Sequence, residues 1–166
     1  MEPWIVNGVA EQREAGHTPQ AGPTGFLISA NAVLHHLGFV VSSISSIAQG
    51  FAASMSARWH GEIIHDPIQR VRVAFFCPVD SRNPVFELVE PASENSPVGN
   101  FLKKGGGLHH VCYEVDDLEA ALEDARSERW AIASLPEPAV AFHGRRIAWV
   151  FSKNRLLVEL LERRPK

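Results

Sequence analysis

The sequence has little of what would mark a secreted, membrane-bound or nucleic-acid-binding protein. Only two of its 166 residues are cysteines, Cys77 and Cys112, too few for a disulfide framework or a cysteine-based zinc site. Both lie in apolar runs, so we expect small buried side chains in a reducing compartment. The formal charge of -3 gives no electrostatic reason to expect nucleic acid or an anionic membrane as a partner.

Long apolar runs are also missing. None is long enough to cross a bilayer, and the first residues lack the basic start and apolar run of a signal peptide, so we expect a cytoplasmic protein. Hydrophobic residues make up 45% of the chain and charged residues 21%, a balance that supports a well-packed core. Residues 1–29 are predicted to be an N-terminal tail or arm, because the stretch 10–25 is rich in glycine, proline and polar residues.

An internal repeat is the most informative feature of the chain. The string HLGFVVSS, which starts at His36, matches HVCYEVDD, which starts at His110, at a shift of 74 positions (110 − 36). QRVRVAFF at 69–76 matches HGRRIAWV at 143–150 at the same shift (143 − 69), and VFEL at 85–88 matches LVEL at 157–160 at a shift of 72 (159 − 87). Ordered matches at nearly one shift indicate two copies of one module.

Each copy predicts the order β-α-β-β-β. An apolar run ending in valine, at 33–41 and at 108–115, favours a first strand, and Ser42-Ser43 and Asp116-Asp117 are suitable N-caps for a following helix. Apolar stripes at helical spacing support both helices: Ile44, Ile47, Phe51 and Met55, and Leu118, Ala121, Leu122 and Ala125. Three strands are expected to follow in each copy, near 59–64, 70–77 and 84–90, and near 130–135, 145–152 and 155–162.

The expected fold class is therefore α+β, with two βαβββ modules. The expected organisation is listed from the N-terminus: tail 1–29, first module 30–91, linker 92–107 with a short helix near 97–103, second module 108–162 and C-terminal tail 163–166.

Two histidines and two glutamates recur at matched positions. His36 and His110 lie in the first strand of each copy, and Glu87 and Glu159 lie in the last. If the copies pair about a pseudo-twofold axis, these side chains converge, and two imidazoles with two carboxylates suit one divalent Co, Mn, Ni, Zn or Fe ion with open coordination positions. Both glutamates have large apolar neighbours, among which an unpaired carboxylate would be costly.

The alternative for each of these residues is structural. A histidine in an apolar strand is more often a hydrogen-bonded core residue than a ligand, and the matched recurrence of all four groups is what favours a metal site. Alternation along a strand predicts that His35 and His109 point to the opposite face from their neighbours. Glu90 and Glu162 lie three positions beyond the proposed ligands, so they are expected to face solvent.

Three strings of the chain resemble methylmalonyl-CoA epimerases and their relatives in the vicinal-oxygen-chelate (glyoxalase/bleomycin-resistance-like) superfamily. They are GGGLHHVCYEVDDLEAAL at 105–122, ELVEPASENSPVGNFLKKG at 87–105 and LLVELLE at 156–162. The resemblance spans about residues 33–162. It implies a homodimer in which two βαβββ modules form a cupped mixed sheet around one divalent metal ion, with His36, Glu87, His110 and Glu159 as ligands.

The chain departs from the epimerase pattern in three places. Phe51 is the only aromatic residue where the first helix of many relatives carries more, and Val73 stands where some epimerases have a second carboxylate. Of the HPKS-G-V-L string that the family carries near the end, only Phe151-Ser152-Lys153-Asn154 remains, without the glycine. These departures leave the substrate open.

The chemistry implied by the resemblance is non-redox proton abstraction next to a carbonyl, as in an epimerase or isomerase. Glu159 and Glu87 are the expected bases, since they lie on opposite sides of the pseudo-axis. The expected partner is a small-molecule substrate such as an acyl-CoA, whose phosphates need cations; the candidates are Lys103, Lys104, Arg145, Arg146, Lys153 and Arg155. Two other functions remain open, a glyoxalase I-like lyase and a non-catalytic small-molecule-binding protein of the same fold.

Overall fold

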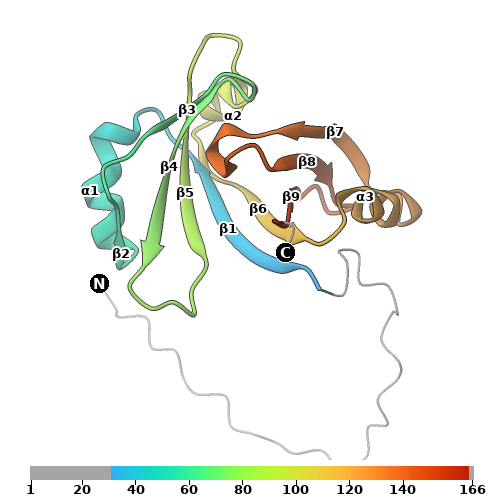
Figure 1. The fold of residues 1–166 in the computed structure, drawn as a ribbon. Helices are drawn as coiled ribbons and strands as arrows, with labels where there is room; N and C mark the ends of the chain where they lie inside the picture. The colour runs from blue at the N-terminus through green and yellow to red at the C-terminus, as the bar shows by residue number, and fades with distance from the viewer. Residues whose placement is uncertain (1–30, 165–166) are drawn as a thin grey trace, which may run out of the picture.

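The computed structural model describes residues 31–164, so the predicted tail at 1–29 and the last two residues of the chain lie outside the described part. Figure 1 shows the elements of both copies. The first copy contains β1 (Val33–Val40), α1 (Ile44–Ser54), β2 (Ala57–Arg58), β3 (Ile64–Asp66), β4 (Val71–Pro78) and β5 (Val85–Pro91). After α2 (Gly99–Lys103), the second contains β6 (Gly107–Val115), α3 (Leu118–Ser127), β7 (Ala131–Pro138), the 3-10 helix η1 (Val140–Phe142), β8 (Arg146–Phe151) and β9 (Leu157–Glu162).

Within residues 31–164, nine strands form one mixed sheet, which confirms the predicted α+β class. The strand order is β2-β4-β5-β1-β6-β9-β8-β7, with β3 paired beside β4. The first strands of the two copies, β1 and β6, pair antiparallel at the centre, and each pairs in parallel with the last strand of its own copy, β5 or β9. The two copies therefore meet within a single chain, strand against strand.

One face of the sheet packs against the helices, and the other lines a cavity. Side chains on one face pack under the helices: Ala74, Phe76, Phe86 and Leu88 with α1, and Ala148, Val150, Val158 and Leu160 with α3. The intervening residues on the same strands, among them Val73, Glu87, Ile147 and Glu159, line a central cavity. Because side chains alternate along a strand, the helices cover the outer face and leave the inner face for a site (Figure 1).

Both helices begin at the predicted caps. The side chain of Ser43 accepts a hydrogen bond from the backbone N–H of Ser46, and that of Asp117 accepts one from Ala120. The predicted stripe of α3 is fully buried: Leu118, Ala121, Leu122 and Ala125. In α1, Ile44 and Ala48 are buried, and the predicted Ile47, Phe51 and Met55 pack against them half-buried.

Three predictions about the first copy are wrong. The strand expected near 59–64 is replaced by the short β2 and β3, with Gly61 in a positive-φ conformation between them. Cys77 is exposed, because it lies opposite Arg58 at the margin of the sheet. Glu90 does lie on the face opposite Glu87, but that face is covered by α1, so the carboxylate is buried and accepts a hydrogen bond from the N–H of Ile44 at 2.5 Å.

Glu162, the equivalent of Glu90 in the second copy, agrees better with the predicted exposure to solvent. Glu162 is partly exposed and forms an ion pair with Arg146. The structural search for membrane spans gives a limited result: no helix within residues 31–164 has both the length and the hydropathy to cross a bilayer.

Candidate metal centre

The structure brings His36, Glu87, His110 and Glu159 together in the cavity. Nε2 of His36 lies 3.1 Å from Nε2 of His110, 3.4 Å from Oε2 of Glu87 and 3.2 Å from Oε2 of Glu159. Nε2 of His110 lies 3.3 Å and 3.7 Å from the same two oxygens. All four residues are at most 5% exposed, so the cluster is almost fully withdrawn from bulk water.

Strand register explains why the two carboxylates occupy matched places. Glu87 of β5 lies opposite Gly38 in the parallel pair with β1, and Glu159 of β9 lies opposite Cys112 in the parallel pair with β6. Gly38 and Cys112 are themselves separated by the repeat shift of 74 (112 − 38). Each copy therefore delivers its glutamate to the same point beside its own first strand.

The pairing of the two copies places the histidines. His110 of β6 lies opposite Gly38 of β1, and His36 lies opposite Cys112. A Cβ atom at Gly38 would come within 2.0 Å of the His110 ring, so the absence of a side chain at position 38 creates the space that the imidazole occupies. Cys112 itself is buried, as predicted, and burial together with Glu159 raises the pKa of its thiol well above the usual range.

The spacing of the donor atoms of His36, Glu87 and His110 fits a divalent metal ion, because these three atoms all lie within 4.8 Å of one another. With metal–ligand distances of about 2.1 Å, donors in a tetrahedral shell lie about 3.4 Å apart. The measured nitrogen–nitrogen and nitrogen–oxygen distances run from 3.1 to 3.7 Å. Oε2 of Glu159 is buried, and its polar neighbours are Nε2 of His36 and Nε2 of His110. Two buried carboxylates are costly unless they are paired or ligated, and a cation held between them and the two imidazoles would lower that cost.

The charged groups of the cluster shift the pKa values of one another. Burial lowers the pKa of His36, but the carboxylates of Glu87 and Glu159 outweigh burial and raise it to about 10. Burial raises the pKa of Glu87, but His36 and His110 outweigh it and lower that pKa to about 2. At neutral pH the pair is therefore an imidazolium next to a carboxylate, and a metal ion must compete with the imidazolium proton.

Binding of a divalent ion at this cluster should consequently tighten as the pH rises. The ion needs the unprotonated Nε2 of His36, whose pKa near 10 means that binding at pH 7 releases a proton. We expect the affinity for Co²⁺ to rise about tenfold for each pH unit between pH 6 and 9. Calorimetry in buffers of different ionisation enthalpy should count about one proton released per ion. An affinity that stays constant over this range would contradict the assignment.

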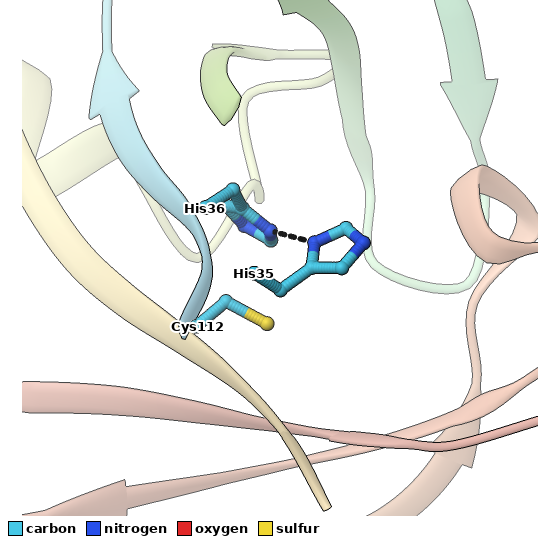
Figure 2. A group of neighbouring side chains, drawn as sticks. All are labelled: His35, His36 and Cys112. Carbon is cyan, nitrogen blue, oxygen red and sulfur yellow. Dashed lines mark hydrogen bonds between the residues drawn. The ribbon is translucent and has the colours of Figure 1, made fainter. Parts of the chain in front are cut away.

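Two further histidines lie beside the cluster, contrary to the sequence-based prediction for them. The pairing of β1 with β6 steps from Leu34 to His36 on one strand and from His110 to Leu108 on the other, so His35 and His109 are each the extra residue of a β-bulge. A bulge interrupts the alternation of side chains. His35 therefore lies next to His36, with their Nδ1 atoms 2.9 Å apart, as Figure 2 shows together with the Cys112 thiol.

Aromatic rings enclose both central histidines. The ring of Phe142 stacks on His36 at 5.8 Å, and Phe75 meets the edge of His36 at 5.9 Å. Trp149 meets His110 at 4.8 Å. Phe75 and Trp149 occupy matched repeat positions (149 − 75 = 74), so the repeat in the sequence already indicates that these two rings occupy equivalent places.

The cavity in front of the cluster has a volume of about 450 Å³ and a largely apolar wall. None of the six cations predicted to bind phosphates lines it. Arg145, Arg146 and Lys153 instead form ion pairs with carboxylates. Among the lysines and arginines of the described residues, only Arg70 lines the cavity, and the sequence did not predict this role for it.

Comparison with known proteins gives consistent relatives. Residues 35–149 match the family model of the Glyoxalase/Bleomycin resistance protein/Dioxygenase superfamily. The chain is 31% identical to the ethylmalonyl-CoA/methylmalonyl-CoA epimerase of Cereibacter sphaeroides, over 76% of this chain and 95% of that protein. It is 32% identical to the mitochondrial methylmalonyl-CoA epimerase of Bos taurus, over 93% of this chain and 86% of that protein.

Solved structures point the same way. A hypothetical protein from Bacillus halodurans superposes with a TM-score of 0.71 at 26% identity, covering 82% of this chain and 97% of that one. A variant of the Streptomyces coelicolor methylmalonyl-CoA epimerase, solved in complex with 2-nitronate-propionyl-CoA, superposes with a TM-score of 0.66 at 25% identity, covering 80% and 97%.

Proposed function

Since the chain belongs to the Glyoxalase/Bleomycin resistance protein/Dioxygenase superfamily, we propose that it is a divalent-metal-dependent epimerase that removes a proton next to the carbonyl of an acyl-CoA thioester. The observation that carries the proposal is the convergence of two imidazoles and two carboxylates in one cavity, in a chain similar to acyl-CoA epimerases.

In this proposal the metal ligands are His36, Glu87, His110 and Glu159, and the ion is Co, Mn, Ni, Zn or Fe. When bound, the ion supplies a Lewis acid that stabilises negative charge on a substrate carbonyl oxygen. The chain itself holds the four residues on four neighbouring strands, β5, β1, β6 and β9. The rings of Phe75, Phe142 and Trp149 pack around the two imidazoles. Exclusion of water strengthens every electrostatic interaction at the site.

Glu159 and Glu87 are the proposed bases. They approach the cluster from β9 and β5, on opposite sides of the central β1–β6 pair. One carboxylate takes the proton from the carbon next to the carbonyl, and the other returns a proton to the opposite face of that carbon, which inverts its configuration. A carboxylate that serves as a metal ligand can take up the proton only when it detaches from the ion, so the base role requires Glu159 or Glu87 to release the ion during the step.

The proposal is tested by deuterium exchange. The full chain, loaded with Co²⁺, Mn²⁺ or Zn²⁺, is incubated with methylmalonyl-CoA or ethylmalonyl-CoA in D₂O, and C2 of the acyl group is followed by NMR. We expect exchange that requires the ion. Absence of exchange with either thioester in metal-loaded protein would overturn the proposal, and tight thioester binding without exchange would favour the non-catalytic binding protein instead.

Arg70 should contribute to binding the anionic substrate. Arg70 lines a cavity whose carboxylates come from Asp66, Glu87, Glu137 and Glu159. We expect Arg70→Ala to raise KM for methylmalonyl-CoA about tenfold at an unchanged kcat, because one charge-assisted hydrogen bond to substrate is lost. Arg58→Ala, an exposed arginine that does not line the cavity, is the matched control. Equal KM values for Arg70→Ala and Arg58→Ala would contradict the assignment.

A further inference from the structure

Two histidines without a role in the proposed mechanism lie beside its two histidine ligands in the same geometry. Nδ1 of His35 is 2.9 Å from Nδ1 of His36, and Nδ1 of His109 is 3.0 Å from Nδ1 of His110. In both pairs the ring centroids are 5.2 Å apart and the rings are nearly perpendicular. The arrangement is thus built twice, once in each copy.

Both pairs depend on a β-bulge. A regular strand would send the side chains of neighbouring residues to opposite faces, as we expected for His35 and His109. The two register shifts between β1 and β6 make each of these histidines an extra, unpaired residue. The bulges therefore turn two additional imidazoles towards the proposed ligands, and Figure 2 shows the pair formed by His35 and His36.

The contact lies on the nitrogen that a metal ion would not use. Nε2 of His36 and of His110 face each other and the two carboxylates, so Nδ1 is the remaining nitrogen of each ring. A neutral imidazole carries one hydrogen, and Nε2 can bind a metal only if that hydrogen is on Nδ1. Both rings are buried, at 0% and 2% exposure, so the Nδ1–H requires an acceptor within the protein.

We propose that His35 and His109 are positioning residues whose Nδ1 atoms accept hydrogen bonds from Nδ1–H of His36 and His110, which fixes Nε2 of both ligand rings towards the metal ion. The inference rests on the proposed function, because it presupposes the four-ligand site. Each positioning histidine carries its own hydrogen on Nε2. The role matches the partner that a metal-ligating histidine usually requires at its second nitrogen.

Packing and hydrogen bonding can be separated experimentally at these positions. The His35 ring meets the edge of Phe142 at 5.6 Å, and the His109 ring meets Phe101 at 4.8 Å. Phenylalanine at either position retains a ring for these contacts but removes the acceptor. Asparagine removes the ring but places its side-chain oxygen near the position of Nδ1, so it retains an acceptor.

The test measures Co²⁺ affinity of the full-length protein by competition with a chelator, together with the visible absorption of the bound ion. His35→Phe and His109→Phe should each weaken binding about 10- to 100-fold, the usual effect of losing such a partner. His35→Asn and His109→Asn should stay within about threefold of the wild type. His65→Phe, which replaces an exposed histidine of β3, is the matched control and should change nothing.

The outcomes distinguish the two proposals. If the wild-type protein binds no Co²⁺, the proposed function fails. If the wild type binds Co²⁺ and the phenylalanine variants bind it equally well, the positioning role is overturned while the metal site stands. Weak binding by both phenylalanine and asparagine variants also overturns the role, because the ring and not the acceptor would then be what matters.

Discussion

Glutamine in place of Glu159 should slow the exchange of the C2 hydrogen of one methylmalonyl-CoA epimer by about 10²- to 10⁴-fold, the usual contribution of a positioned base. A glutamine side chain preserves the shape of the residue and still offers a carbonyl oxygen to the metal ion, but it cannot take up a proton. The measurement is NMR-detected exchange in D₂O with each epimer separately, at saturating metal and with the metal content determined for each preparation.

The same reasoning applies to Glu87, the proposed base on the other side of the site. Glu87→Gln should impair exchange of the opposite epimer, because Glu87 approaches from the other side of the β1–β6 pair. Glu162→Gln, a partly exposed acid of the same strand as Glu159, serves as control and should leave both exchange rates near those of the wild type. If Glu159→Gln and Glu87→Gln slow both epimers equally while retaining metal, the assignment of one base to each face is wrong.

Alanine in place of Gly38 should abolish tight metal binding. The new Cβ would lie 2.0, 2.4 and 2.5 Å from Cε1, Nε2 and Nδ1 of His110, so the imidazole must leave its position. The backbone at Gly38 has little freedom to retreat, because β1 is paired with β5 on one side and β6 on the other. We expect Co²⁺ affinity to fall at least about 100-fold, more than for loss of a hydrogen-bond partner of a ligand, with a stability loss of about 1–3 kcal/mol from overpacking.

Gly50→Ala supplies the control for this substitution. Gly50 lies within α1, and a Cβ there would meet no atom within 4 Å. Alanine should raise helix stability by about 0.5–1 kcal/mol and leave Co²⁺ affinity unchanged. Chelator competition and thermal unfolding of both variants provide the comparison. Wild-type metal affinity in Gly38→Ala would mean that His110 is not a ligand.

The internal repeat explains how much of the candidate site could be predicted from the sequence. His36 and His110 each stand in a commonplace apolar strand, and neither alone identifies a ligand. Their recurrence at one shift, with Glu87 and Glu159 at nearly the same shift, implied a common centre before any contact was known. The structure places both carboxylates within 3.7 Å of the two imidazoles, because β1 and β6 pair across the centre of the sheet.

The features that escaped prediction depend on contacts between elements. Strand alternation is a local rule, whereas the bulges at His35 and His109 arise from a mismatch between β1 and β6 that no single strand reveals. Glu90 was assigned to the correct face, but the position of α1 over that face decides its burial. Arg70 reaches the cavity through the turn before β4, where it adopts a positive φ of 57°, which hydrophobic patterning does not indicate.

The most direct test of the account is to locate the metal ion. The full-length protein, stripped and reloaded with Co²⁺ or Mn²⁺, should bind one ion per chain by elemental analysis. Anomalous scattering from its crystals should place that ion about 2.0–2.2 Å from Nε2 of His36 and His110 and from one oxygen each of Glu87 and Glu159. An ion bound elsewhere, or loaded protein that retains none while these four side chains keep their positions, would contradict the account.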